Sequence, residues 1–138
     1  SFTDPQAGKE LAFTQFGQGA DIVYHASGAC GIGAIKAAKE RDKYAIGVDS
    51  PQYHLAPEHV LTSMIKRVDL AVYNEVKATY NDNFKAGHKV YGLAEDSVGI
   101  YREQAKKMVP EEVLNKVDEY KQKIIDGEIS VPKKPKDV

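Results

Sequence analysis

Apolar positions along the chain alternate between helical stripes and short continuous runs. A stripe over residues 5–18 repeats at helical spacing, and Asp4 followed by Pro5 is typical of an N-cap and a first helical position. Residues 22–26 and 44–48 are apolar runs bounded by turn residues and too short for ordinary helices, so we interpret them as buried strands. The helical stripe consists of Ala7, Leu11, Ala12 and Phe16.

A glycine-rich loop and a short two-faced helix lie between these two strands. Apolar positions of the helix, such as Ile35, alternate with charged ones, such as Lys36. Strand, helix and strand predict a right-handed βαβ unit, whose parallel strands end at the same edge of the sheet. Ligands of such sheets bind beyond that edge. The loop at residues 27–33 and Asp49 both lie there, so they are the first candidates for a binding site.

The remainder of the chain continues the alternation of strands and helices. We expect a third strand, a long amphipathic helix, edge strands, a last helix and a short strand before a loose tail. In order, these are residues 60–65 with Lys66 at the end, residues 68–84, one or two edge strands within residues 89–101, residues 110–126, residues 128–131 and the Lys/Pro-rich tail at residues 133–138. The long helix carries Val68, Ala71, Val72, Val76 and Thr79 on one face.

This alternation predicts an α/β fold, a parallel sheet flanked by helices, as one unit over residues 1–132. The chain has no initiator Met and starts a helix at once, so only Ser1 and Phe2 could be the end of a preceding strand. We therefore expect a fragment cut just after a strand of a longer protein. The absence of a signal peptide then says nothing about where the parent is located.

Composition narrows the classes of function. The 138 residues are enough to bury about two thirds of the unfolded surface. A net charge of −1 and a pI of about 6.4 argue against nucleic acid and anionic membrane surfaces as partners. No apolar run approaches the ~20 residues of a transmembrane helix. The single cysteine, Cys30, excludes an internal disulfide and a multi-cysteine metal site.

Asp49 and Lys66 are the charged candidates at the strand ends. A carboxylate such as Asp49 can accept two hydroxyl hydrogen bonds from a vicinal diol, as in a ribose; the alternative is an ordinary loop or N-cap carboxylate. Lys66 opens a helix, where a cation is electrostatically unfavourable, which suggests a functional reason with Asp49 as partner. The alternative is that Lys66 is solvated or paired with Asp69.

The glycine loop is the second candidate. Its spacing, Gly28-x-x-Gly31-x-Gly33, is the reverse of the dinucleotide fingerprint, yet it places backbone N–H groups at a helix N-terminus, where polar or anionic groups are favoured. A tight strand-to-helix turn is an equal alternative. His25, near the end of the first strand, either touches a ligand or is a satisfied, half-buried ring.

Other chemistry finds little support in the residues. His54, Glu58 and His59 do not fit a zinc spacing, and Pro57 opposes the helix that would align them, so we expect no metal. Cys30 lacks the glycine spacing of a nucleophile elbow. No acid–base pair for catalysis is evident, and we expect neither an enzyme nor a cofactor.

Several linked motifs resemble one known family. They are Ala-Asp-Ile-Val-Tyr at residues 20–24, the loop at residues 26–33, Tyr-Ala-Ile-Gly-Val-Asp-Ser at residues 44–50, Val-Leu-Thr-Ser-Met-Ile-Lys-Arg-Val-Asp at residues 60–69, Gly-Lys-Glu at residues 8–10, and Gly-Glu-Ile with Val-Pro at residues 127–132. Together they resemble the basic membrane protein family of bacterial substrate-binding lipoproteins, which includes purine nucleoside receptors of ABC importers.

The resemblance implies the C-terminal lobe of a type I periplasmic-binding-protein fold, whose two lobes close around a ligand. It assigns ribose-binding roles to Asp49 and Lys66, and it places Ser27 and Gly28 on the cleft wall. It further implies an N-terminal lobe, an ABC permease partner and a lipid anchor outside this chain. Two departures from the family pattern are Ala29-Cys30 in the glycine loop and Pro51 in place of a second acid. A cytoplasmic transcriptional regulator with the same lobes is the alternative function.

Overall fold

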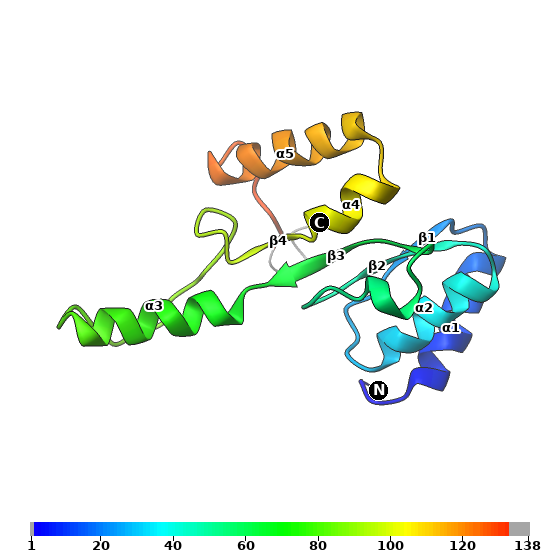
Figure 1. Cartoon of the computed structure of the whole chain (residues 1–138), viewed down its shortest axis with the longest axis horizontal. Coiled ribbons are helices and arrows are strands. Elements are labelled where there is room, and N and C mark those ends of the chain that lie inside the picture. Colours follow the sequence, from blue (N-terminus) through cyan, green and yellow to red (C-terminus); the bar gives the residue numbers. More distant parts are fainter. Residues whose placement is uncertain (1, 133–138) are drawn as a thin grey trace.

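A computed structural model describes residues 2–132, so Ser1 and the tail predicted to be loose, residues 133–138, lie outside the described residues. The elements in chain order are α1 (Pro5–Gly17), β1 (Ile22–Tyr24), α2 (Cys30–Glu40), β2 (Tyr44–Gly47), the 3₁₀ turn η1 (Tyr53–Leu55), β3 (Val60–Lys66), α3 (Val68–Tyr80), β4 (Val98–Ile100), α4 (Arg102–Met108) and α5 (Glu111–Ile125). Figure 1 shows them.

The sheet has the order β1-β2-β3-β4. β1 pairs parallel with β2, and β2 pairs parallel with β3, whereas β4 joins the other edge of β3 in the antiparallel direction. This arrangement confirms the α/β prediction of a parallel sheet flanked by helices. Parallel pairing carries the C-terminal ends of β2 and β3 to one edge of the sheet.

The core lies between the sheet and the α1–α2 pair. Ile35 of α2 is fully buried, and it shares the core with Ala45 of β2 and Val60 of β3. The two helices approach closely because their contact is lined by glycine. A Cβ on Gly33 would lie 1.8 Å from the carbonyl oxygen of Pro5, so no larger residue fits there without moving α1.

Local signals explain where the helices begin. The Asp4 side chain accepts hydrogen bonds from the amides of Gln6 and Ala7, at 3.0 and 3.1 Å, as predicted for an N-cap. The helix α2 begins at Cys30, inside the glycine loop. The helix α3 ends at Tyr80 rather than at residue 84.

The second half of the chain differs in part from the sequence predictions. One of the one or two edge strands expected within residues 89–101 is present as β4, whereas residues 89–93 form none, because Lys89 and Tyr91 reach back to Glu75 of α3. Residues 128–131 form no strand, because the amides of residues 128 and 129 bond to the Lys123 carbonyl and close the end of α5. The helix α4 was missed, since it turns Gln104 and Ala105 inward rather than an apolar stripe.

The predicted apolar face of α3 is present, but none of it is buried against residues 2–132. No residue of α3 is buried, and the helix projects away from the end of β3 (Figure 1). Leu70 is partly buried, but five large side chains of the helix have exposed fractions from 58% at Val68 to 87% at Tyr80. These side chains are Val68, Val72, Tyr73, Val76 and Tyr80.

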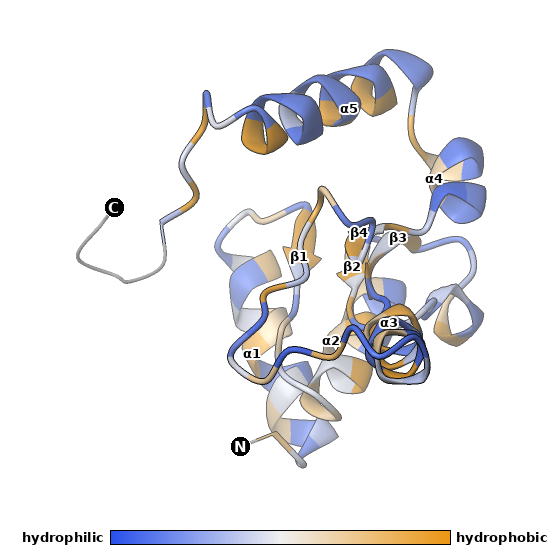
Figure 2. Cartoon of the chain, turned by 90° about the vertical axis from the view of Figure 1, so that its left-hand side faces the viewer, coloured by the Kyte–Doolittle hydropathy of each residue, from blue (hydrophilic) through white to orange (hydrophobic). Residues whose placement is uncertain are grey.

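The sheet is also covered unevenly. Side chains alternate between the two faces of a strand, so the neighbours of buried Val23 and Ala45 point away from α1 and α2. Three of these neighbours, Ile22, Tyr24 and Tyr44, are 42–54% exposed, and Ile46 is partly buried. The helix α5 lies on that side but stands off the sheet, with its apolar underside facing it (Figure 2). Parallel sheets in compact domains are usually covered on both faces.

Stability of this chain should therefore depend on α2 and hardly at all on α3. We expect Ile35→Ala to lower the free energy of unfolding by about 2–5 kcal/mol, because it leaves a cavity in the core. Val76→Ala should change that free energy by less than about 0.5 kcal/mol, because Val76 is 63% exposed. Urea denaturation of both variants measures the difference, and equal losses would contradict this description of the core.

Candidate ligand-binding site

Asp49 and Lys66 meet at the edge where β2 and β3 end. The Lys66 ammonium lies 2.9 Å from a carboxylate oxygen of Asp49, and the Lys66 amide donates to the Asp49 carbonyl at 3.0 Å. Both side chains are more than half exposed, at 54% and 56%. The pair therefore combines a fixed backbone with charged groups that a ligand can reach.

The alternative partner for Lys66 is already engaged. Asp69 accepts from the guanidinium of Arg67 at 2.7 Å, and this hydrogen bond lowers the pKa of Asp69. The two neighbouring cations therefore have different partners. Lys66 pairs across the strands with Asp49, whereas Arg67 pairs locally at the start of α3.

The turn that carries Asp49 has an uncommon backbone. Asp49 has φ of 67°, in the left-handed region, where aspartate is tolerated better than most L-residues. The amide of Ser50 donates to the carbonyl of Val48 at 2.8 Å, which tightens the turn. Asp42, Asp82 and Asp96 share this backbone, so the Asp49 turn differs in the hydrogen bonds that support it.

Gln52 supplies that support. Its side-chain oxygen accepts from the amide of Val48 at 2.9 Å and lies 3.0 Å from Nε2 of His25, while its own amide donates to the Ser63 hydroxyl at 3.0 Å. Gly47 leaves the necessary space, since a Cβ there would lie 2.4 Å from that hydroxyl. One glutamine thus links the ends of β1 and β2 to β3. Sequence analysis missed Gln52 and Ser63, and Ser63 in an apolar strand was the available signal.

His25 lies beneath this site and is only 5% exposed. Its ring packs on Gly31 of α2, where a Cβ would come within 2.0 Å of Nδ1. Because the Gln52 oxygen is an acceptor, the imidazole proton belongs on Nε2. Burial lowers the pKa of His25, although the hydrogen bond to Gln52 and the charge of Asp49 oppose this.

Ser27 and Gly28 occupy the α1 side of the β1 end. Gly28 has φ of 57°, and the next amide, that of Ala29, donates to the Phe2 carbonyl at 2.9 Å. Ser27 and His25 line a depression of about 280 Å³ together with residues of α1, and neither Asp49 nor Lys66 lines it. The structure therefore links His25 to the charged pair through Gln52, whereas Ser27 lines a depression that neither member of the pair lines.

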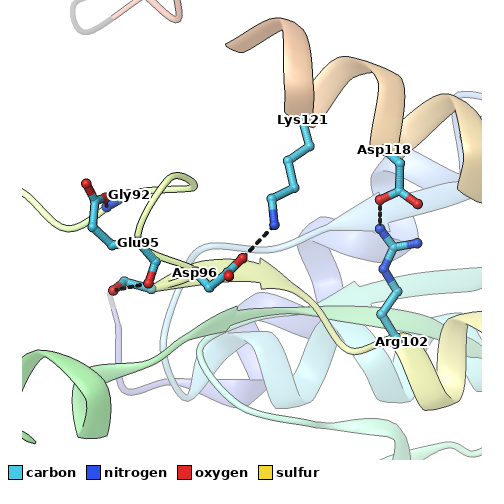
Figure 3. A network of polar contacts seen from close by, with 7 residues as sticks. Gly92, Glu95, Asp96, Arg102, Asp118 and Lys121 are labelled. Atoms are coloured by element: carbon cyan, nitrogen blue, oxygen red, sulfur yellow. Dashed lines mark hydrogen bonds and ion pairs between the residues drawn. The ribbon is translucent and has the colours of Figure 1, made fainter. Parts of the chain in front are cut away.

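A larger depression, of about 560 Å³, lies near the end of β3, and neither Asp49 nor Lys66 lines it. It lies between the β3–β4 ribbon and α5, and Pro51 and Arg67 are among the lining residues nearest in sequence to the pair. Figure 3 shows the ion pairs that hold α5 above it, Arg102 with Asp118 and Lys121 with Asp96. The volume is within the range of small-molecule sites.

The described residues also bear on the metal and membrane questions. His59 uses its Nδ1 to contact the Lys43 carbonyl at 3.0 Å. Across residues 2–132, no group of three His, Cys, Asp or Glu side chains is arranged to hold a metal ion. Over the same range, no helix has the length and apolar character needed to cross a bilayer.

Burial of His25 should make the stability of the chain depend on pH. In the unfolded chain a histidine has an ordinary pKa near 6.5, whereas folding lowers the pKa of His25, so the unfolded state binds the proton more tightly. Stability should be full above pH 6.5 and should fall below it by up to about 1.4 kcal/mol per pH unit.

Urea denaturation between pH 5 and 7.5 measures this slope. Carboxylates whose pKa is lowered by folding, such as Asp69 and Asp96, change the unfolding free energy only at lower pH, where they become protonated. His25→Gln should flatten the slope, and His54→Gln, at an exposed position, should leave it unchanged. A slope that survives His25→Gln would contradict the assignment.

Comparison with known proteins places this arrangement in a family. The model of a family described as "ABC transporter substrate-binding protein PnrA-like" matches residues 1–135. The chain is 42% identical over 137 residues to basic membrane protein A of Borreliella afzelii, covering 96% of this chain and 41% of that protein. It is 37% identical over 151 residues to the CD4+ T-cell-stimulating antigen of Listeria innocua, covering 97% and 42%.

Solved structures agree with these matches. A solute-binding protein of an ABC transporter system from Aeropyrum pernix has a TM-score of 0.81 and 27% identity, over 98% of this chain and 47% of that one. A transcriptional activator of the comK gene from Bacillus halodurans also has a TM-score of 0.81, at 22% identity, which shows the shared fold alone. The matched region covers 91% of this chain and 44% of the activator.

The chain spans about two fifths of the length of these curated relatives. The resemblance seen in the residues at 20–69 and 127–132 is confirmed by a match over nearly the whole chain. The chain belongs to the Bmp family of PnrA-like ABC transporter substrate-binding proteins.

Proposed function

We propose that this chain is the C-terminal lobe of the extracytoplasmic substrate-binding component of an ABC importer. In this proposal a purine nucleoside binds in a cleft between two lobes, and the protein carries out no chemistry. The observation that carries it is the exposed Asp49–Lys66 pair, an acid and an amine 2.9 Å apart at the C-terminal edge of a parallel sheet.

The pair suits the diol of a ribose. The Asp49 carboxylate can accept protons from two adjacent hydroxyls, and the Lys66 ammonium can donate to a hydroxyl oxygen. An exposed ion pair contributes only about 0–1 kcal/mol in water. A ligand therefore disrupts little when it takes over part of this interaction, and closure of a second lobe would strengthen the new bonds by removing water.

The uncovered apolar surfaces support a two-lobed parent. Five large side chains of α3 and three of β1 and β2 are exposed here, and relatives have more than half of their length outside the matched stretch. We propose that part of that length covers the face of α3. The lobe by itself should then bind a nucleoside weakly, because half of the cleft is absent.

Membership of this family also supports a proposal for location and partners. We propose that the parent is extracytoplasmic and attached to the cell membrane by a lipid anchor outside this chain, where it delivers its ligand to an ABC permease. Membership of a substrate-binding family supports this role and supports no enzymatic one.

A ligand-sensing lobe of a cytoplasmic transcriptional regulator is the second candidate. The Bacillus halodurans activator has the same fold, but at 22% identity that likeness concerns the fold alone. The coding sequence upstream of Ser1 separates the two candidates. A signal peptide with a lipobox cysteine supports the transport role, and a DNA-binding segment supports the regulator.

Calorimetry on the full-length protein tests the ligand. We expect adenosine to bind more tightly than a 2′,3′-dideoxy analogue, and Asp49→Asn to weaken adenosine binding by about 10-fold to 100-fold, as expected for hydrogen bonds to a charged group. Asp82→Asn is a matched control, since Asp82 also has a positive φ, of 55°, in an exposed turn. Binding of a free sugar or a peptide, with no heat from any nucleoside, would reject the proposal.

The covering of α3 is tested by one variant in two chains. In the 138-residue chain, Val76→Asp should leave the unfolding free energy nearly unchanged, because Val76 is 63% exposed. In the full-length protein it should cost roughly 1–3 kcal/mol, because a carboxylate would be placed in an apolar contact. Similar small effects in both chains would show that α3 remains uncovered.

A further inference from the structure

We propose that His25 is a positioning residue for the candidate ligand site, and that it acts through Gln52 on the turn that carries Asp49. The inference rests on the proposed function only for the identity of the ligand. Its geometry comes from the described residues alone. His25 does not need to touch the ligand in this role, which agrees with its burial at 5% exposure.

The contacts form a continuous path. Nε2 of His25 lies 3.0 Å from the Gln52 side-chain oxygen, which also accepts from the Val48 amide at 2.9 Å. Val48 directly precedes Asp49, and its carbonyl accepts from the amide of Ser50. The path thus reaches both sides of the residue whose carboxylate pairs with Lys66.

The imidazole is itself held in one orientation. Gly31 lies against the ring so closely that any Cβ there would overlap Nδ1. Nδ1 has no hydrogen-bond partner among the described residues, whereas Nε2 has one. A buried ring with one nitrogen unpartnered is an uncommon arrangement, and the Gln52 contact is its polar link to the site.

Gln52 needs this link to stay folded over the strand ends. Its main-chain amide is held by Ser63, which is 1% exposed, and its side-chain oxygen is held by His25 and Val48. Loss of the His25 donor leaves the Gln52 side chain with its hydrogen bond to the Val48 amide alone, while the Lys66 amide still holds the Asp49 carbonyl without fixing φ of Asp49. Because Asp49 has a left-handed backbone, a freed turn should relax toward negative φ and move the carboxylate away from Lys66.

The first measurement is nuclear magnetic resonance on the 138-residue chain, which involves no ligand and no substitution. Long-range nitrogen–proton correlation should place the His25 proton on Nε2, and Asp49 should show the strong intraresidue amide-to-Hα contact of a positive φ. A proton on Nδ1 would overturn the proposal, because Nε2 could then not donate to Gln52.

The second measurement compares variants in the full-length protein with adenosine as the probe. His25→Leu should weaken binding about tenfold, as expected for loss of one hydrogen bond in the path, whereas His25→Gln should stay within about threefold because its amide can still donate. His59→Leu is the matched control, since it removes a comparable histidine contact, to the Lys43 carbonyl, at the opposite end of the strands.

The outcomes separate positioning from simple packing. Equal loss of affinity in His25→Leu, His25→Gln and His59→Leu would overturn the proposal and assign His25 to the core. If no nucleoside binds the wild-type protein, the proposed function fails, and the Asp49 backbone signal in His25→Leu decides this inference alone. An unchanged positive φ at Asp49 in that variant would overturn it.

Discussion

The parallel pairing of β2 with β3 is the constraint on which the candidate site depends. Parallel neighbours end at the same edge, so Asp49 and Lys66 meet although 16 positions separate them in the sequence. The Lys66 amide bonds to the Asp49 carbonyl and continues the ladder one step past β2. The sheet therefore anchors the main chain of the pair at this hydrogen bond, Gln52 holds the rest of the turn, and the charged side chains remain free to exchange partners.

The support beneath this edge is polar and buried, which is uncommon in so small a core. Ser63 and His25 are almost fully buried, and Gln52 connects them across Gly47. Buried polar groups are costly unless they are hydrogen-bonded, so this network specifies one arrangement of the strand ends. The opposite end of the sheet is held mainly by apolar packing of α2, as at Ile35 and Val60. The molecule thus places polar support under the edge where a ligand would bind and apolar packing elsewhere.

Much of the fold could be predicted from periodicity and turn chemistry. The Asp4 cap, the strands that begin at Ile22, Tyr44 and Val60, and the parallel sheet follow local signals that the structure preserves. The helix α4 could not be predicted, because its inward residue Gln104 is polar and is satisfied by the carbonyls of Pro57 and Val60, a long-range contact. The amphipathic pattern of α3 was correct, but pattern alone does not tell whether the apolar face has a partner within the chain.

In the site, too, some residues could be predicted from local sequence signals and others depend on long-range contacts. Strand ends identified Asp49 and Lys66, since topology decides which ends meet. No sequence pattern identified Gln52, because its role depends on the space left by Gly47 and on the His25 donor, which follows a different strand. Ser27 and Gly28 were chosen from the glycine loop, yet the structure places Ser27 in a depression on the α1 side.

The most direct test is a crystal structure of the full-length protein with adenosine bound. The account predicts ribose hydroxyls within hydrogen-bond distance, about 2.5–3.2 Å, of the Asp49 carboxylate and the Lys66 ammonium. A ribose bound elsewhere, with the Asp49–Lys66 pair intact and facing solvent, would contradict it.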